Sequence, residues 1–359
     1  MHDIESLSEH ARLRVPYYNG SFARAVLAGP SLEGLIAVDC DFVQADFQAA
    51  DLREATFING KLADTSFLAA KLDKAQFIRC DLKAADFSGL SIKDAQFVEC
   101  NLVGSNFAAC VIHMTTFVSC NLAKSHFSAA SIEKSVLIES DVAGIDLTKA
   151  DLRNVMIFEA DLTEARLEGL KAHGIMLMKA DFGRRDLRSL ELARSNLARS
   201  NLAGVNLSGV DATGSLFLEA DLSGADLRGI KAPMAMFAKA NLDSALMNDA
   251  QLSMSNFSEA KLTHADLTGA RLDRAVFTGA DARASKLDRT NLDYALLEHL
   301  RLEGASLLAA HFNRTSLHCS ALDAGLTMGA AGGTIGTDSE RAIAELYDPR
   351  RVSLAGDVN

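Results

Sequence analysis

Residues 67–97 read FLAAKLDKAQFIRCDLKAADFSGLSIKDAQF, and this stretch decides the fold because a large apolar residue occupies every fifth position. The series continues beyond the quoted stretch without a slip. Its members are Phe67, Leu72, Phe77, Leu82, Phe87, Ile92, Phe97, Leu102, Phe107, Ile112, Phe117, Leu122 and Phe127. A period of five residues is therefore the feature that the structure of this chain has to explain.

A five-residue period fits neither of the regular secondary structures. An α-helix turns by about 100° per residue, so residues five apart spread over all of its faces. A plain β-strand alternates every two residues and would send successive members of the series to opposite faces. The pattern therefore predicts a unit in which a short extended segment is followed by a corner that resets the phase.

The residues around each large one define this unit. A small residue lies two positions earlier and a polar one lies between them, as in Ala85, Asp86 and Phe87. Small, polar and large residues in succession indicate side chains that point in, out and in again. The other two residues form a turn, in which a glycine such as Gly89 suits a positive φ.

Like residues also recur at a spacing of twenty. One such column comprises Phe57, Phe77, Phe97 and Phe117. Because twenty residues contain four units, each coil is expected to be a rough square that stacks on like residues of its neighbours. The phase holds from Phe22 to Leu322. It predicts an all-β fold, a four-sided parallel β-helix solenoid of about fifteen coils and about 70 Å in length.

The ends of the chain lack the period. We expect four segments: a cap at 1–20, the β-helix at 21–322, a Gly-rich linker at 323–337, and a short C-terminal helix and tail at 338–359. Leu7 and Ala11 have helical spacing, so a short amphipathic helix could cover the first coil. The C-terminal helix, with Asp338 as its N-cap, either caps the last coil or pairs with another chain.

The repeat of a small residue, Asp or Asn, Leu or Phe, and two further residues resembles that of the pentapeptide-repeat family. Good matches to its consensus are ADLRE at 50–54, ADLTE at 160–164, ANLDS at 240–244 and ADLTG at 265–269. The resemblance extends over the whole periodic region. It implies a right-handed, four-sided β-helix.

Composition restricts the possible partners. Lys plus Arg number 36 against 47 Asp plus Glu, a net charge of −11, so no direct nucleic-acid binding through a basic surface is expected. The chain has no Trp, and of its 18 Phe only Phe158 lies off the period, which predicts that Phe fills the core. Without a long apolar run, neither a signal peptide nor a membrane span is expected. We expect a cytoplasmic protein.

The sequence contains no catalytic motif that we could identify, neither a P-loop nor a nucleophile elbow nor a paired-cysteine motif. Five of the six cysteines share the small inward position: Cys40, Cys80, Cys100, Cys110 and Cys120. A metal or disulfide ladder is one interpretation. Small apolar filler is favoured, since neighbouring repeats place Ala or Ser there. We therefore expect no enzyme, no cofactor and no metal site.

One outer side carries apolar residues in coil after coil. We call the following residues the apolar column: Ile58, Ile78, Val98, Val118, Ile138, Met156, Phe158, Met176, Met178, Leu216 and Leu218. Contiguous apolar surface of this extent usually marks an interface, so the column is predicted to bind a protein. The alternative is that β-branched residues simply favour extended strands, which explains Ile and Val but not the methionines or Phe158.

A second candidate site is basic. Residues 179–199 hold six basic and three acidic residues. Five arginines among them could dock an acidic partner: Arg184, Arg185, Arg188, Arg194 and Arg199. A solvated surface of mixed charge is the favoured alternative. Arg185 lies at an inward position, so a local distortion is expected there.

Two functions compete. The first is a rigid, non-catalytic scaffold that binds a protein partner, or a second copy as a homodimer, through the apolar column. The second is implied by the resemblance, because some pentapeptide-repeat proteins are acidic rods that imitate B-DNA and bind DNA gyrase, conferring quinolone resistance. Such a mimic needs near-continuous negative columns, which Lys61, Lys71 and Lys231 interrupt here. The scaffold is therefore favoured.

Overall fold

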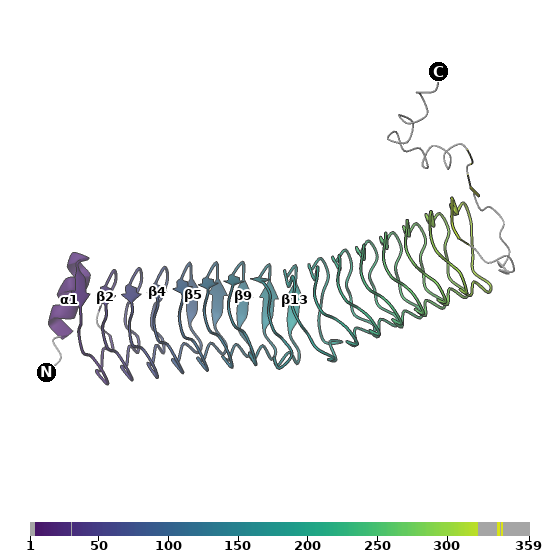
Figure 1. The fold of residues 1–359 in the computed structure, drawn as a ribbon. Helices are drawn as coiled ribbons and strands as arrows, with labels where there is room; N and C mark the ends of the chain where they lie inside the picture. The colour runs from purple at the N-terminus through teal and green to yellow at the C-terminus, as the bar shows by residue number, and fades with distance from the viewer. Residues whose placement is uncertain (1–3, 30, 322–335, 338, 340–359) are drawn as a thin grey trace, which may run out of the picture.

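The computed structural model shows the chain wound into a solenoid that extends along one axis (Figure 1). The structure describes residues 4–29, 31–321, 336–337 and 339. Parallel pairings join residues twenty positions apart and recur every five residues. Those of one coil are Ser21↔Asp41, Val26↔Asp46, Ser31↔Asp51 and Ile36↔Thr56. Four pairings in each coil make it four-sided, so the predicted parallel β-solenoid is confirmed.

The regular elements are short. One helix, α1, spans Ile4–Leu13. The strands are β1 (Pro16–Tyr18), β2 (Ile36–Val38), β3 (Thr56–Ile58), β4 (Gln76–Ile78), β5 (Ser91–Lys93), β6 (Gln96–Val98), β7 (Val111–His113), β8 (Thr116–Val118), β9 (Ser131–Glu133), β10 (Val136–Ile138), β11 (Asp151–Arg153), β12 (Met156–Ile157) and β13 (Lys171–His173). They form an eight-stranded sheet, β1-β2-β3-β4-β6-β8-β10-β12, and a five-stranded sheet, β13-β11-β9-β7-β5.

Regular strands occupy only part of the rod. The eight-stranded sheet accounts for eight turns of the solenoid, fewer than the fifteen or so coils that the period predicts. Beyond it, pairing at the twenty-residue spacing continues as isolated bridges, as far as Arg301↔Ala321. The first half places β-branched residues such as Ile78 and Val98 on its strands, whereas later repeats mostly place other residues there, such as Ala238 and Ser258. Since β-branched residues favour extended backbone, the strands fade where these residues become rare.

Two columns of phenylalanine fill the first half of the core. Rings twenty residues apart stack nearly parallel, with centroids 4.7 Å apart for both Phe67–Phe87 and Phe87–Phe107. Rings of different columns meet edge to face, at 6.2 Å for Phe77–Phe87. All four side chains are fully buried, as predicted. Each aromatic pair contributes roughly 0.5–1.5 kcal/mol beyond the burial of its surface.

Most corners contain one residue in the left-handed region. Gly89, at φ 70°, and Gly104, at φ 66°, meet the expectation for glycine. Many other corners place a larger residue there, such as Glu99 at φ 54° and Lys124 at φ 58°. This conformation costs a residue with a side chain about 1–2 kcal/mol. Stacking of the inward side chains and pairing between coils must therefore offset that cost at each such corner.

The N-terminal cap is confirmed as a helix. Leu7 and Ala11 of α1 are buried against the first coil. The segment contains more than the helix, however, because β1 already pairs with β2 through Tyr17↔Ala37. The Tyr17 ring also lies 5.5 Å from that of Phe22, between centroids. Residues 16–18 thus belong to the solenoid, which begins before the predicted boundary at residue 21, and Tyr17 lies five residues before Phe22 in the same phase.

Departures from the repeat are compensated in one place and not in another. Ala172 occupies a position that is usually large, and Leu170 occupies the small position beside it; both are buried. Two side chains that share one interior space can exchange volume in this way. Ala282 has only a small neighbour, Ala280, and the structure contains an apolar cavity beside it. The volume missing at Ala282 is therefore not compensated.

The end of the chain is described only in part. The predicted linker at 323–337 and the C-terminal helix at 338–359 lie almost entirely outside the described residues. Thr337 is described, and its Oγ1 accepts a hydrogen bond of 3.2 Å from the backbone N–H of Cys319. Within the described part of the chain, we find no helix with the length and apolar character needed to cross a membrane.

Candidate functional site

The members of the apolar column lie together on one side of the rod. They project from the eight-stranded sheet and from the bridges that continue it. Their pairings include Ile58↔Ile78, Ile78↔Val98, Val98↔Val118, Val118↔Ile138 and Met156↔Met176. Paired strands are separated by about 4.8 Å, so these side chains stack in register along the axis.

The apolar column is half-buried. Ile138, at 37% exposed, is the single member that is classed as exposed, and the other ten are intermediate. The cause is the close stacking, because each side chain is shielded by the ones before and after it. The column therefore offers a smooth strip of apolar contact and not a series of protruding side chains.

The coil at residues 181–200 divides the column. Asn196 lies between Met176 and Leu216 in the flanking position and bridges to both of them. Ala198 takes the position that Met178 occupies one coil earlier, and it is only 9% exposed. The longer part of the column thus ends at Met178, and a short part follows at Leu216 and Leu218.

Charged residues border the column at the adjacent corner. Lys179 Nζ lies 2.6 Å from a Glu159 carboxylate oxygen, and Arg199 Nε lies 2.9 Å from Glu219. Lys179 Nζ is also 5.6 Å from the centroid of the Phe158 ring. Exposed ion pairs such as these contribute about 0–1 kcal/mol each. They limit the width of the apolar strip more than they stabilise the fold.

The five arginines of the predicted basic site belong to one coil but to all four of its sides. Arg184 and Arg185 lie on the first side, and Arg188, Arg194 and Arg199 lie on the second, third and fourth sides. Two of them already have acidic partners, since Arg188 pairs with Asp186 at 2.6 Å and Arg199 with Glu219. The structure therefore does not bring the arginines together as one patch.

Arg185 replaces a neutral donor of other coils. At the same inward position, Cys80 donates a hydrogen bond to a backbone carbonyl 23 residues earlier. Arg185 Nη1 likewise donates to the carbonyl of Leu162, at 2.7 Å. The corner before Arg185 has shifted by one residue. In most other coils the residue directly before the inward one has the positive φ, but here Gly183 has it, at 59°, and Arg184 does not. The predicted distortion is confirmed, although the guanidinium contacts a carbonyl oxygen and not an acidic side chain.

The pairing between coils is interrupted on two sides beside Arg185. In the described stretch 161–200, neither Arg166 and Asp186 nor Lys171 and Glu191 form a bridge. His173 Nε2 lies 2.7 Å from the Glu191 carboxylate and spans this gap. We call the interruption between residues 166–173 and 186–193 the seam. The axis of the rod changes direction just beyond β13, close to the seam (Figure 1).

The five inward cysteines are free, buried thiols. Cys110 Sγ donates a hydrogen bond of 2.9 Å to the carbonyl of Phe87, and Cys100 Sγ donates one of 3.2 Å to that of Phe77. Burial raises the pKa of Cys110 to about 12. A thiol with this pKa stays protonated and unreactive at neutral pH. The side chains therefore fill space, as predicted, and also bond to the preceding coil.

The repeated Asp and Asn side chains bond to the turns. Asp146 Oδ1, for example, accepts a hydrogen bond of 2.9 Å from the N–H of Thr148. Where an arginine lies two residues after the Asp, it also forms an ion pair with the carboxylate. The hydrogen bond from Arg188 lowers the pKa of Asp186 to about 2. These carboxylates are held in the ionised form by structural contacts.

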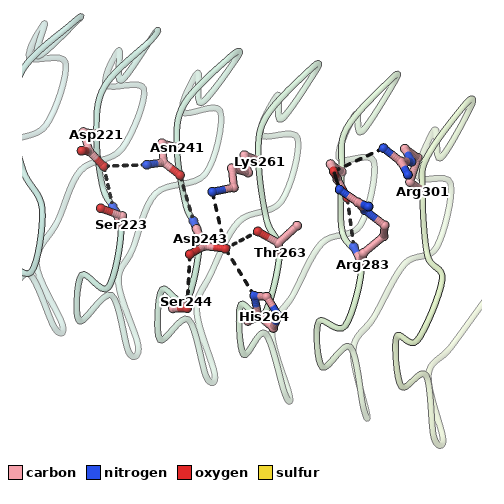
Figure 2. Close-up of polar contacts among 11 residues, drawn as sticks. Asp221, Ser223, Asn241, Asp243, Ser244, Lys261, Thr263, His264, Arg283 and Arg301 are labelled. Atoms are coloured by element: carbon pink, nitrogen blue, oxygen red, sulfur yellow. Dashed lines mark hydrogen bonds and ion pairs between the residues drawn. The ribbon is translucent and has the colours of Figure 1, made fainter.

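Figure 2 shows a polar network on the side that follows the apolar one. Asn241 donates to Asp221 Oδ1 at 3.0 Å. The Asp243 carboxylate is contacted by Thr263, by His264 at 3.3 Å and by Lys261 at 3.7 Å. The hydrogen bond from Thr263 lowers the pKa of Asp243. Since a general base needs a pKa near the working pH, this cluster is suited to stability and not to catalysis.

One group of donors in the described chain could hold a metal ion. It comprises His299, His318 and Cys319, whose donor atoms all lie within 4.8 Å of one another. The sequence pattern did not lead us to this group. Two other histidines, His113 and His173, belong to β7 and β13 and are three coils apart.

Models of one protein family match most of the solenoid. The model described as "Pentapeptide repeat region" matches residues 38–107 and 90–167. The model described as "Pentapeptide repeats (8 copies)" matches residues 191–229 and 255–293. Together the matches cover more than half of the 359 residues. The chain belongs to the pentapeptide-repeat family.

Solved structures of other pentapeptide-repeat proteins are similar to this chain. HetL, involved in heterocyst differentiation regulation in the cyanobacterium Nostoc sp., is 27% identical over 67% of this chain and 89% of its own, with a TM-score of 0.25. A protein of the Arabidopsis thaliana thylakoid lumen is 26% identical over 29% of this chain and 69% of its own, with a TM-score of 0.25. QnrB1, a plasmid-mediated fluoroquinolone resistance protein, is 21% identical over 51% of this chain and 91% of its own, with a TM-score of 0.30. No curated protein matches the sequence.

Proposed function

We propose that this pentapeptide-repeat protein is a rigid, non-catalytic scaffold that binds a protein partner along the apolar column. The observation that carries the proposal is the stacking of apolar side chains in register on one side, from Ile58 to Met178. In later coils, from Asp221 to Arg301, the next side carries a polar network whose groups contact one another (Figure 2). A partner that buries apolar surface would therefore be directed to one side of the rod.

The strongest contacts are expected around Phe158. Met156, Met176 and Met178 lie beside it on the same and the next coil. Interface cores are depleted in charged residues and enriched in aromatic residues and Met, and Met adapts its shape to a partner. Binding energy usually concentrates in a few such residues. The Ile and Val members of the column would then add complementary surface on one flank.

The experiment replaces two residues of the column with aspartate, Phe158→Asp and Met178→Asp in one protein. Both side chains point outward, so the fold should remain intact while binding weakens by about 2 kcal/mol or more. Light scattering measures self-association, and affinity purification from the native cell, with quantified recovery, measures capture of another protein. The first measurement tests a second copy as the partner, and the second tests a different protein.

A matched control uses two methionines on another side of the rod. Met234 and Met254 are 51% and 46% exposed and lie twenty residues apart, at equivalent corners. The double variant Met234→Asp and Met254→Asp introduces the same charge and should leave binding unchanged. Equal behaviour of the two double variants in both measurements would contradict the proposal.

A DNA mimic that binds gyrase has less support. Many carboxylates that would replace phosphates form an ion pair with an arginine two residues later, at 2.7 Å for both Asp51–Arg53 and Asp151–Arg153. An imitation of the DNA backbone needs negative charge that is free to meet a basic partner. If the purified protein altered supercoiling by gyrase at micromolar concentration, the mimic would replace the scaffold proposal.

A further inference from the structure

A group of three potential metal ligands lies at the C-terminal end of the described solenoid. Cys319 Sγ is 3.5 Å from His318 Nε2. The rings of His299 and His318 meet edge to face with centroids 5.6 Å apart. The three donor atoms are mutually within 4.8 Å, so a single small cation could contact all of them.

The coil geometry accounts for this arrangement. His299 and Cys319 are one coil apart and take equivalent corner positions, with φ 55° and 51°. The N–H of His299 donates to the carbonyl of His318 at 2.9 Å, which fixes the two corners against each other. His318 is only 2% exposed, whereas Glu298 and Thr278, at the same position of the two preceding coils, are half-buried.

The distance between Cys319 and His318 agrees with a tetrahedral zinc site. Zn–S bonds of about 2.3 Å and Zn–N bonds of about 2.0–2.1 Å, at tetrahedral angles, separate a sulfur from a nitrogen ligand by roughly 3.5 Å. The Cys319–His318 contact has this length. Two imidazoles and a thiolate are ligands that suit Zn²⁺ and not Mg²⁺ or Ca²⁺. Three protein ligands leave a fourth position for water.

We propose that His299, His318 and Cys319 bind one Zn²⁺ ion. Binding converts the Cys319 thiol to a thiolate and releases its proton to solvent, while both imidazoles bind as neutral rings. The ion joins the coil of His299 to that of His318 and Cys319. The last described pairing, Arg301↔Ala321, lies at the same junction. The metal thus fastens the last described coil to the coil before it.

The simplest alternative is a hydrogen bond between the Cys319 thiol and His318 Nε2, which would have a similar length. That contact does not require His299. A metal site requires all three residues, so the contribution of His299 separates the two interpretations.

The test starts from full-length protein freed of metal with a chelator and titrated with ZnCl₂ by calorimetry. We expect one Zn²⁺ per chain, and a thiolate-to-metal charge-transfer band when Co²⁺ takes its place. His299→Asn and Cys319→Ser should each weaken binding by at least about tenfold. Circular dichroism confirms that each variant is folded. Zn²⁺ should raise the melting temperature of the wild type and have a smaller effect on both variants.

The matched control is His311→Asn, which removes an exposed imidazole on the same coil as His318 and should leave Zn²⁺ binding unchanged. The proposal is overturned if the wild type shows no saturable Zn²⁺ binding. It is also overturned if the Co²⁺ form lacks the charge-transfer band, or if folded His299→Asn binds Zn²⁺ as tightly as the wild type.

Discussion

The phenylalanine-rich coils and the coils at the seam share the same five-residue period but differ in how well they pair. In the first region, Phe67, Phe87 and Phe107 stack at 4.7 Å, and the bridges Ser66↔Asp86 and Asp86↔Asn106 join the coils on the same side. In the second, no bridge joins Arg166 to Asp186 or Lys171 to Glu191 within the described stretch. The period alone therefore does not secure the pairing between coils.

The difference arises from what fills the interior. In the first region the two phenylalanine columns place like rings above and below each other, so successive coils have the same width there. Around the seam the inward positions hold Leu162, Ala172, Phe182 and the cationic Arg185 in turn. Close-packed interiors respond to changes in volume by shifting the backbone. The residues between the family matches, 168–190, cover much of this irregular region.

The largest effect is expected from removing a ring in the regular region. Phe87 contacts four other rings, those of Phe67, Phe77, Phe97 and Phe107. Phe87→Ala should cost about 4–5 kcal/mol, from the cavity and the lost aromatic pairs. The free energy of unfolding is measured in urea by circular dichroism.

The matched variant in the irregular region is Phe182→Ala. Phe182 is just as buried, at 1% exposed, but the residues one coil before and after it are Leu162 and Leu202. The loss should be smaller, about 3 kcal/mol, because no stacked ring partners are lost. An equal or larger loss for Phe182→Ala would show that ring stacking does not distinguish the two regions.

A smaller effect is expected from closing the seam. Arg185→Ser places a hydroxyl where other coils have one, within reach of the Leu162 carbonyl, and removes a cation from an inward position. Stability should rise by about 1 kcal/mol. Hydrogen exchange of the amides at 186–191 should slow. Arg184→Ser, at the exposed neighbour, serves as the control and should change neither quantity.

The architecture could be predicted from the sequence because one rule is repeated. Every fifth residue faces the same interior, so the inward positions, the four sides and the parallel stacking all follow from a single period. The extent of regular strand could not be predicted from the period, since it depends on which outward residues are β-branched. The position of the seam could be predicted from Arg185. Its size could not be predicted, because it depends on how several unlike side chains pack together.

The candidate sites were predictable to different degrees. The apolar column follows from the twenty-residue period, and the structure places its members in register. Its half-burial was missed because a single sequence position does not show the shielding by its neighbours. The arginines are close in sequence, yet the coil distributes them over four sides. His299 and Cys319, in contrast, are separated by one coil, a spacing that would have indicated their contact.

The smallest expected effect concerns acid, and it tests whether the seam differs electrostatically from the regular region. Hydrogen bonds from Arg188 and Arg153 lower the pKa of Asp186 and of Asp151, that of Asp186 to about 2. The unfolded value is about 3.9, so the folded protein holds these protons less tightly. The contribution of each pair to stability is then complete above about pH 4 and is lost as the pH falls towards 2.

The melting temperature should accordingly fall between pH 4 and pH 2, and less steeply in Asp186→Asn and in Asp151→Asn. Both pairs include an arginine that is more than half exposed, so each change should be slight and should shrink further in high salt. Equal changes in the two variants would mean that the seam is a packing irregularity alone. A clearly larger change for Asp186→Asn would mean that the Asp186 pair also holds the seam together. Closing the seam with Arg185→Ser should then reduce the difference between the two Asn variants.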